Sequence, residues 1–486
     1  MNQFHRFINL LLGVCLIGHG GAAAGAQDQA TNSSPNIVII YADDLGYGDL
    51  GCYGDMPSVT PRLDRMAEQG ARFTDFYSAQ PVCSASRAAL LTGCYSNRVS
   101  IVGALSPAQH YGLNHQEVTL AQLVKQKNYA TAIYGKWHLG HHPDFLPKTF
   151  GFDDYYGLPY SNDMSPLPED NPGSEPKKQF PPLPLIAGTT AIATSPDQSQ
   201  LTTSYTEHAV KFITDHRDRP FFLYVPHTMP HVPLRVSSKF AGKTGRGLYS
   251  DVMAEIDWSV GQILDTLEQH KLTERTLVIF SSDNGPWKVF GNHGGSPGPL
   301  RESKGTVYEG GVRVPCIVRW PGHIPAKTVI REPAIMMDWF PTIARVTGCQ
   351  LPAQPIDGRD LWPLLTVPGT KSPHDALFFY YRDCELQAMR SGRWKLLFPH
   401  EVGSTEGIVL GRDGVSGRGI RRQIGLELYD LQEDLSEQRN LAESHPDVVA
   451  ALQKQADAMR EELGDRLQQK IGKAVRPHED FPASTQ

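Results

Sequence analysis

The sequence has few cysteines and no large excess of charge of either sign. Only 7 of its 486 residues are cysteine, and the formal net charge is −6, with acidic and basic residues interspersed. A small disulfide-stabilised scaffold and a basic nucleic-acid-binding surface are therefore not expected. Cys15 lies in the N-terminal apolar segment, and Cys83 belongs to a candidate catalytic motif described below. The other five cysteines are available for structural roles. Because five is odd, at least one should be unpaired in a monomer, and the fold must depend on its hydrophobic core.

Long apolar runs are also rare, and the one near the N-terminus is short. Arg6 precedes an apolar segment over residues 7–17, and small residues at 24–26 precede Gln27. This pattern predicts a secretory signal peptide over residues 1–26, cleaved on export to the periplasm or the extracellular space. A membrane anchor is the alternative, but it needs a longer apolar run. No other segment predicts a transmembrane helix, so no membrane association is expected.

Apolar, β-branched runs alternate with helical stretches over residues 35–366. Strands are expected at 35–41, 129–134, 220–225 and 276–280, and helices at 60–69, 119–127, 204–216 and 250–270. Such alternation is typical of a doubly wound α/β domain. The proline-rich stretch 158–198 is expected to be a long surface excursion that lines a substrate cleft.

Shorter strands replace this alternation towards the C-terminus. They are expected at 376–381, 386–391, 394–398 and 427–431, followed by an amphipathic helix at 446–464. This pattern predicts a smaller α+β domain over residues 374–472. The glycine- and arginine-rich stretch 403–425 is expected to be a loop, and the tail 473–486 to be disordered.

One stretch combines a cysteine, an arginine and the start of a helix. The segment 83–93, CSASRAALLTG, begins at Cys83, has Arg87 four positions later and closes with Gly93. Cys83 is therefore expected at the N-terminus of a short helix. Backbone N–H groups and the positive end of the helix dipole favour an anion there. Taken alone, however, a free cysteine is usually a small buried hydrophobe.

Polar side chains follow the predicted strands, where α/β sheets bind their ligands. Asp43 and Asp44 follow the first strand, and Asp283 and Asn284 follow the fourth. If the two strands are neighbours, the two pairs converge, and hard oxygen ligands without a sulfur or imidazole partner suit Ca²⁺ or Mg²⁺. Asp-Asn-Gly is also a common turn sequence, so this pair alone does not establish a metal site.

Three further polar residues come from other strand ends and loops. Lys136 and His138 follow the strand 129–134 and point to the same side of an extended segment. His231 lies beyond the strand 220–225. Each residue taken singly would be an ordinary solvated side chain.

Together, these motifs resemble the sulfatase family. Residues 83–93 are similar to its Cys-x-Pro/Ala-x-Arg signature, which directs oxidation of the cysteine to Cα-formylglycine, and residues 129–140 are similar to its second signature. Ala85 is the less common residue at its position, and Cys94 stands where many relatives have arginine. Residues 157–161 are similar to the branch that contains arylsulfatase A and N-acetylgalactosamine-6-sulfatase.

The resemblance implies a fold, a chemistry and a set of site residues. The fold is an alkaline-phosphatase-like doubly wound mixed sheet with a smaller C-terminal α+β domain. The chemistry is that of a sulfuric ester hydrolase, with Cys83 converted to formylglycine by a formylglycine-generating enzyme. The cation, Ca²⁺ or Mg²⁺, is expected to be bound by Asp43, Asp44, residue 83, Asp283 and Asn284. The implied catalytic residues are Cys83, Arg87, Lys136, His138, His231 and Lys304, whereas Glu309, Arg313 and Asp338 are expected to be structural.

The resemblance also implies roles for individual side chains. Lys136 and Lys304 bind the sulfate oxygens, His231 is the acid for the leaving oxygen and His138 is the base. His227 and His293 lie near these residues in the sequence but have no matching position in the family, so they are interpreted as loop histidines.

Two other functions fit the same residues. A phosphate-ester or phosphonate hydrolase of the same superfamily would use the same cation-rich site. A protein that binds sulfated glycans without acquiring formylglycine would bind ligand with calcium but not turn it over; Ala85 and Cys94 motivate this alternative. The expected substrate of the sulfatase is a sulfated carbohydrate, with aryl sulfates as assay substrates, and the loops 158–198 and 403–425 are expected to recognise it.

Overall fold

The apolar, β-branched runs of the sequence form the centre of a large mixed sheet. Strands β1 (Asn36–Ala42), β5 (Ala130–Tyr134), β9 (Phe221–Pro226) and β10 (Thr276–Ser282) lie side by side in parallel and are buried along their whole length. Strands covered on both faces need no polar alternation, which explains their continuous apolar sequences.

The computed structural model describes residues 34–54, 59–170, 173, 177 and 179–481. The signal peptide predicted over residues 1–26 lies outside these ranges. The described residues from 34 onwards form one compact unit, so the domain limits expected at 366 and 374 stay a prediction. Among the helices of the described ranges, none has the length and apolar character needed to cross a membrane.

Shorter strands extend both edges of this sheet and make it mixed. One edge carries β11 (Cys316–Arg319), β2 (Ala71–Phe73) and β12 (Thr328–Ile330), and the other carries β6 (Asp154–Gly157), β7 (Pro184–Ala187) and β8 (Thr190–Thr194). Strands β10, β11 and β2 pair antiparallel, as do β6, β7 and β8. The excursion expected over 158–198 is thus only partly irregular, because β7 and β8 within it continue the sheet.

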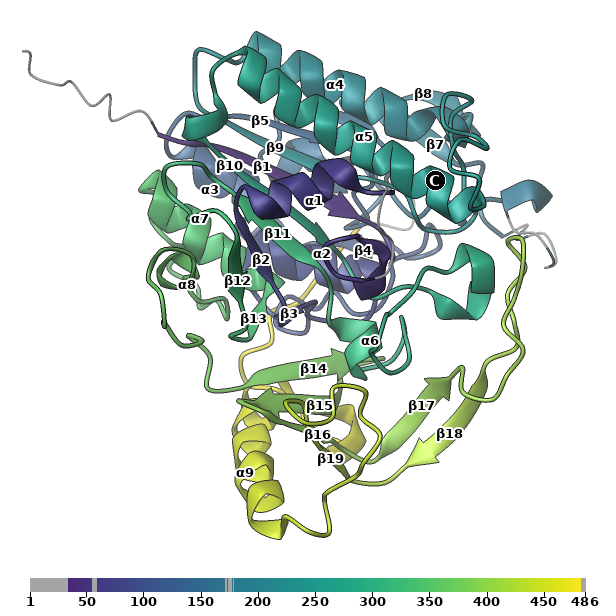
Figure 1. The fold of residues 1–486 in the computed structure, drawn as a ribbon, viewed down its shortest axis with the longest axis vertical. Coiled ribbons are helices and arrows are strands. Elements are labelled where there is room, and N and C mark those ends of the chain that lie inside the picture. Colours follow the sequence, from purple (N-terminus) through teal and green to yellow (C-terminus); the bar gives the residue numbers. More distant parts are fainter. Residues whose placement is uncertain (1–33, 55–58, 171–172, 174–176, 178, 482–486) are drawn as a thin grey trace, which may run out of the picture. The chain divides into compact units, whose positions relative to one another are not determined.

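Helices cover both faces of the sheet, as predicted for a doubly wound domain (Figure 1). On one face α1 (Pro61–Glu68), α4 (Leu201–Asp215) and α5 (Leu248–Gln269) pack against Val38 and Ile40. On the other, α2 (Cys83–Thr92), α3 (Leu120–Lys125) and α7 (Trp339–Thr347) pack in the core that contains Ile37 and Ile39. Successive residues of β1 therefore belong to two different cores, as the pleat requires.

The predicted smaller α+β part is present at the C-terminus. Strands β14 (Leu377–Tyr381), β15 (Glu385–Ser391), β16 (Trp394–Leu397) and β19 (Glu427–Asp430) form an antiparallel sheet, and α9 (Pro446–Leu463) packs on it. The expectation of a loop over 403–425 is wrong at both ends of that stretch. There β17 (His400–Ser404) and β18 (Ile420–Ile424) form a hairpin, whose polar residues obscure the strand pattern (Figure 1).

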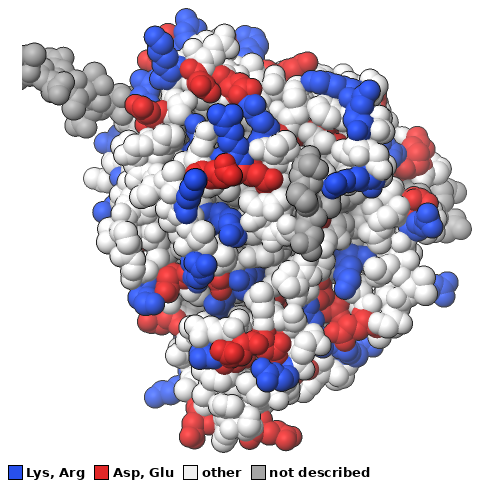
Figure 2. Space-filling model, viewed as in Figure 1, with Lys and Arg blue, Asp and Glu red and all other residues white. Residues whose placement is uncertain are grey.

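The other short elements of the described chain complete the fold. They are β3 (Phe76–Tyr77), β4 (Tyr111–Gly112), α6 (Glu309–Val312), β13 (Ala334–Ile335), α8 (Trp362–Thr366) and β20 (Glu479–Asp480). Charged side chains of both signs are interspersed on the face shown in Figure 2. All six described cysteines are free.

A buried ion-pair network joins the two sheets. Lys395 of β16 is fully buried, and its Nζ lies 2.8 Å from Glu309 Oε1 and 3.0 Å from Glu437 Oε1. Arg313 bonds Glu309 at 3.1 Å and Asp75 at 2.9 Å. A buried charge is tolerated only when it is paired, so Glu309 and Arg313 have the structural surroundings expected of them.

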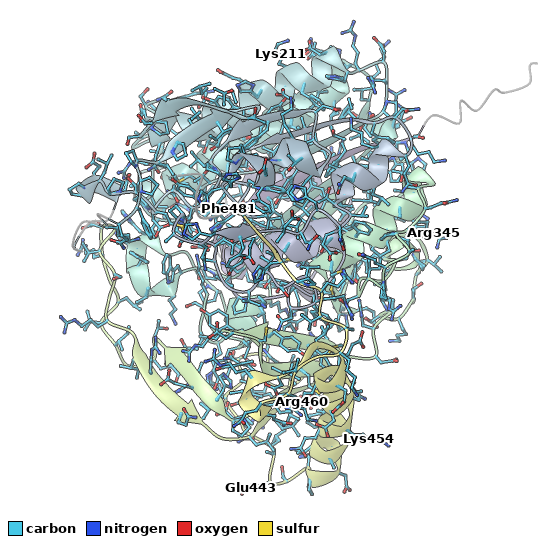
Figure 3. All side chains as sticks on the ribbon, turned by 180° about the vertical axis from the view of Figure 1, so that it is seen from behind. Lys211, Arg345, Glu443, Lys454, Arg460 and Phe481 are labelled. Carbon is cyan, nitrogen blue, oxygen red and sulfur yellow. The ribbon has the colours of Figure 1, made fainter. Side chains whose placement is uncertain are left out.

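The chain after α9 contacts residues that precede the smaller C-terminal sheet. Arg476 bonds Glu117 at 2.6 Å and donates to Cys94 Sγ at 3.2 Å, while β20 pairs with β4. Figure 3 shows Phe481 away from α9, and its buried side chain packs against the rings of His142 and Phe145. The prediction of disorder from residue 473 is therefore wrong for 473–481, because these contacts join residues too distant in sequence for a local pattern to reveal. Residues 482–486 lie outside the described chain.

Candidate active site

The acidic pairs that follow β1 and β10 meet at one edge of the sheet. Ala42 and Ser282 are register partners in adjacent parallel strands, so the next residues of both leave the sheet together. The Asp44 amide donates to Asp283 Oδ1 at 3.1 Å, and Asn284 Nδ2 donates to Asp44 Oδ1 at 2.7 Å. The convergence that the sequence made conditional on neighbouring strands is therefore present.

Cys83 is the first residue of α2 and faces this acidic cluster. Val82 precedes the helix in an extended conformation, and Gly93 ends it in the left-handed region at φ 71°. The Cys83 side chain is buried, and its Sγ lies within 4.8 Å of ligand atoms of Asp43, Asp44 and His231. Burial raises the pKa of the Cys83 thiol to about 12, although Lys136 and Lys304 oppose this. The unmodified thiol is thus neutral at physiological pH and a weak nucleophile.

Arg87 connects this helix to the strand ends. Its side chain is fully buried, and Nε and Nη2 donate to Asp283 Oδ2 at 3.2 and 2.8 Å. Nη1 donates to the Lys136 carbonyl at 2.9 Å. One guanidinium therefore fixes the first turn of α2 relative to the residues that follow β10 and β5.

Two lysines place ammonium groups beside the carboxylates. Lys136 bonds Asp43 Oδ2 and approaches Ser161 Oγ at 3.2 Å, and Lys304 lies 2.7 Å from Asp44 Oδ1 and 3.6 Å from Cys83 Sγ. Burial alone would lower the pKa of each lysine, but Asp43 beside Lys136 and Asp44 beside Lys304 raise both. Both side chains are accordingly cationic.

His138 has one ring nitrogen bonded and one free. Its Nε2 lies 2.7 Å from the Leu105 carbonyl oxygen, which can only accept a hydrogen bond, so Nε2 carries the hydrogen. Its Nδ1 is buried and has no hydrogen-bond partner. Burial, with Lys136 and Arg87 nearby, holds the pKa of His138 well below its usual 6.5. The ring is therefore neutral, with an available lone pair on Nδ1.

His231 lies beside the Asp44 carboxylate. Its Nδ1 bonds the Val232 carbonyl oxygen at 2.5 Å, which leaves Nε2 directed towards Asp44 Oδ2 at 3.6 Å. Burial and the Lys304 ammonium lower the pKa of His231. This histidine can exchange a proton through Nε2 with a group bound in the cluster.

The acidic cluster fits a divalent cation. Asp43 Oδ1 and Asn284 Oδ1 are buried and have no hydrogen-bond partner. Burial and the neighbouring Asp43 carboxylate raise the pKa of Asp283 to about 7, while Arg87 opposes the rise. Oxygen donors of this kind are the preferred ligands of Ca²⁺ and Mg²⁺.

Two histidines, which the sequence analysis interpreted as loop residues, make none of the contacts described above. His227 is buried, its Nε2 lies 3.2 Å from Ser259 Oγ, and burial lowers its pKa to about 4. His293 is half-buried in the short helix Lys288–His293. Asp338, expected to be structural, accepts hydrogen bonds from the Ile335 and Arg359 amides.

Sequence reasoning missed three contributors to the site. Ser161 contacts Lys136, the Leu105 carbonyl orients His138, and the Trp287 ring lies beside both His231 and Lys304. Ser161 carried a signal, since it ends the stretch 157–161. The sequence gives no signal for the role of the Leu105 backbone carbonyl. Trp287 could have been found only by considering the residues that follow Asp283 and Asn284 at the end of β10.

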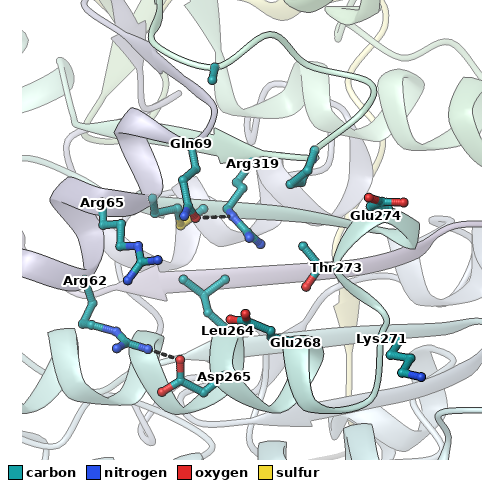
Figure 4. A pocket seen from close by; sticks show the side chains of 13 residues that line it. Arg62, Arg65, Gln69, Leu264, Asp265, Glu268, Lys271, Thr273, Glu274 and Arg319 are labelled. Atoms are coloured by element: carbon teal, nitrogen blue, oxygen red, sulfur yellow. Dashed lines mark hydrogen bonds and ion pairs between the residues drawn. The ribbon is translucent and has the colours of Figure 1, made fainter.

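A separate cavity of about 650 Å³ lies between α1 and the end of α5 (Figure 4). Two of its charged residues bond neighbours: Arg62 bonds Asp265, and Arg319 Nε donates to Gln69 at 2.8 Å. None of the residues that line it belongs to the cluster around Cys83. This cavity is therefore not the candidate active site, although its volume would admit a small molecule.

Family comparisons agree with this geometry. The model described as sulfatase matches residues 35–349, and that described as the C-terminal region of aryl-sulfatase matches residues 372–479. A third, N-sulphoglucosamine sulphohydrolase, C-terminal, matches residues 303–398.

Individual relatives cover almost the whole chain. Arylsulfatase A of Homo sapiens is 41% identical over 459 residues, covering 90% of each chain. N-acetylgalactosamine-6-sulfatase of Canis lupus familiaris is 38% identical over 418 residues, covering 82% of this chain and 78% of that one. The crystal structure of PsFucS1 sulfatase from Pseudoalteromonas sp. superposes with a TM-score of 0.77 at 28% identity, covering 88% of this chain and 91% of that one. The chain belongs to the sulfatase family and is a sulfuric ester hydrolase of the arylsulfatase type.

Proposed function

We propose that the cluster around Cys83 is the site at which this sulfatase hydrolyses its ester. The observation that carries the proposal is the position of Cys83: it starts a helix, is buried, and lies beside Lys304 and the Asp43–Asp44 pair. A sulfate ester is an anion that repels nucleophiles, so its hydrolysis needs cations around sulfur. This cluster supplies two ammonium groups and a place for a metal ion.

The cation is proposed to be Ca²⁺, with Mg²⁺ as the alternative. Asp43, Asp44, residue 83, Asp283 and Asn284 would hold it. When bound, the cation supplies Lewis-acid stabilisation to the sulfate oxygens and lowers the pKa of the attacking hydroxyl. Support comes from the two buried oxygens of Asp43 and Asn284 that have no hydrogen-bond partner.

Residue 83 is proposed to act after oxidation by a formylglycine-generating enzyme. As a hydrated aldehyde it supplies two geminal hydroxyls, one to attack sulfur and one whose deprotonation later releases sulfate. The position of residue 83 at the start of α2, beside Lys304 and the Asp43–Asp44 pair, supports this role. Arg87 keeps residue 83 in place through its bonds to Asp283 and to the Lys136 carbonyl.

Lys136 and Lys304 are proposed to bind the sulfate oxygens. Both are charged, and their Nζ atoms lie on the Asp43 and Asp44 carboxylates that flank residue 83. The first backbone N–H groups of α2 add an anion-binding helix end to the same place. Positive charge is thus arranged before the ester binds, where it stabilises charge that develops on sulfate during displacement.

The two histidines are proposed to move protons in opposite directions. His138 Nδ1 has a free lone pair, fixed by the bond from Nε2 to the Leu105 carbonyl, and so accepts a proton from residue 83. His231 Nε2 donates a proton to the leaving oxygen, because Nδ1 is bonded to the Val232 carbonyl. The negative sulfate ester favours the protonated form of His231 needed for this step.

We propose a sulfated carbohydrate as the natural substrate and export to the periplasm or the extracellular space. Similarity to N-acetylgalactosamine-6-sulfatase supports the first, and the signal-peptide pattern supports the second.

The test compares turnover of nitrophenyl sulfate and nitrophenyl phosphate by the purified protein and its Cys83 variants. We expect a higher kcat/KM for the sulfate, no turnover by Cys83→Ala, and a single sulfation without turnover in Cys83→Ser, because a serine ester has no second hydroxyl. A preference for phosphate would favour the phosphate-ester hydrolase. Calcium-dependent binding of sulfated glycan without turnover would favour a binding protein.

A further inference from the structure

We propose that Trp287 recognises the organic ring that carries the sulfate ester and thereby determines specificity. This inference rests on the proposed function, since it assigns a role in the same site. The residues described above bind sulfate and move protons, but they provide no surface for the rest of the substrate.

Trp287 adjoins both side chains that face the ester bond. Its indole centroid lies 4.3 Å from Lys304 Nζ and 5.4 Å from the centroid of the His231 ring. Lys304 is assigned to the sulfate oxygens and His231 to the leaving oxygen. The group attached to that oxygen must therefore lie close to the indole, which is half-buried rather than enclosed in a core.

Trp287 lines two small cavities. One of about 300 Å³ is lined by Val232, Pro233, Phe290 and Asp163, and the other, of about 230 Å³, by Lys304, Ser404, Thr405 and Arg421; Trp287 lines both. Small-molecule sites span about 300–1,000 Å³, so the first cavity is at the lower limit of this range, which suits a single ring, and the second is smaller. A ring placed in either cavity meets the indole.

The first cavity combines an aromatic wall with acidic groups. Phe290 packs edge-on to Trp287, with centroids 4.8 Å apart and an angle of 66° between the rings, and so limits rotation of the indole. Asp163, bonded to Lys177 at 3.0 Å, and Asp170 provide carboxylate oxygens on the same cavity. A pyranose ring has an apolar face for stacking and hydroxyls for those carboxylates, whereas an aryl ring uses the stacking alone.

The two segments expected to recognise substrate meet beside this tryptophan. Residues Asp163 and Asp170 come from the stretch 158–198, and Gly414, Ser416 and Gly417 from the loop of the β17–β18 hairpin. The Gly411 and Gly417 amides both donate to the Val289 carbonyl, at 2.9 and 2.8 Å. These bonds hold the hairpin loop against the residues that directly follow Trp287.

The experiment measures KM for nitrophenyl sulfate and the inhibition constant of inorganic sulfate in Trp287→Ala and Trp287→Phe. We expect Trp287→Ala to raise KM by about tenfold or more, while Trp287→Phe, which keeps an aromatic face, changes it by less than about threefold. Inorganic sulfate has no ring, so its inhibition constant should change by less than about twofold in both variants.

Trp258→Ala is the matched control. Trp258 is also half-buried and also has a lysine over its ring, with Lys239 Nζ 3.9 Å from the centroid, but it lies on α5 and lines neither cavity. Its removal should change neither constant.

Two outcomes overturn the inference. Equal rises in KM and in the sulfate inhibition constant would show that Trp287 acts through Lys304, and unchanged constants would show that it has no role. Absence of turnover by the unsubstituted enzyme would refute the proposed function instead. Ring recognition is then still tested by saturation-transfer NMR of nitrophenyl sulfate, whose ring signals should be lost with Trp287→Ala.

Discussion

The Nζ atom of Lys304 lies 3.6 Å from the sulfur of Cys83 and 2.7 Å from the Asp44 carboxylate. This ammonium group is therefore in contact with the proposed nucleophile and with a proposed metal ligand. A charge in that place is available to sulfate oxygens without any movement of the backbone.

Replacing Lys304 should consequently impair catalysis more than folding. We expect Lys304→Ala to lower kcat by about 10²–10³-fold, the effect of removing one preorganised charge-stabilising donor. Steady-state kinetics with nitrophenyl sulfate measure this effect, and Lys239→Ala, which removes a lysine outside the site, is the control. A kcat within about threefold of the original enzyme would contradict the assignment of Lys304 to the sulfate oxygens.

The pH dependence of kcat follows from the environment of His138. Burial, together with Lys136 and Arg87, lowers its pKa well below 6.5, and a base must be unprotonated to act. Activity is thus lost only when the pH falls through this lowered value, so the acidic limb of the kcat profile should lie below pH 6.5. The same limb should disappear in His138→Ala, at a much lower residual rate. An acidic limb well above pH 6.5 that persists in this variant would show that another group controls it.

Removal of the cation should affect both activity and stability. Chelation of the purified enzyme is expected to abolish turnover and lower Tm, because a ligand that binds only the folded state stabilises it. Added Ca²⁺ should restore both. In Asp43→Asn, which weakens the site, chelation should change Tm much less; an equal change in both proteins would place the stabilising ion elsewhere.

The segment after α9 should contribute to stability. Glu117 is buried, and removal of its partner by Arg476→Ala leaves its carboxylate unpaired. We expect a loss of about 1–3 kcal/mol in the free energy of unfolding, measured by denaturant titration. Adding Glu117→Gln should recover part of this loss, because it removes the unpaired charge. Unchanged stability in Arg476→Ala would mean that the contact contributes nothing.

Much of the fold was predictable because its signals are local. The strands before Asp43 and Asp283 are continuous apolar runs, and the helix that begins at Cys83 ends at a glycine, so element type and order follow from short stretches. Convergence of the two acidic pairs needed one further fact, the adjacency of β1 and β10, which only the folded chain provides.

The features that sequence did not reveal depend on distant contacts. The β17–β18 hairpin has polar, glycine-containing strands, and the position of Arg476 beside Cys94 joins residues 382 apart. In the sequence, nothing distinguishes Trp287 from other aromatic residues in loops. Only the fold places Lys304 and His231 beside its ring.

The state of residue 83 tests the central claim most directly. It is read from the mass of the tryptic peptide Phe73–Arg87, prepared from protein made in its native host. The account predicts an aldehyde in place of the thiol, in a fraction of molecules that matches the active fraction. An unmodified cysteine in a protein that nevertheless turns over nitrophenyl sulfate many times would contradict it.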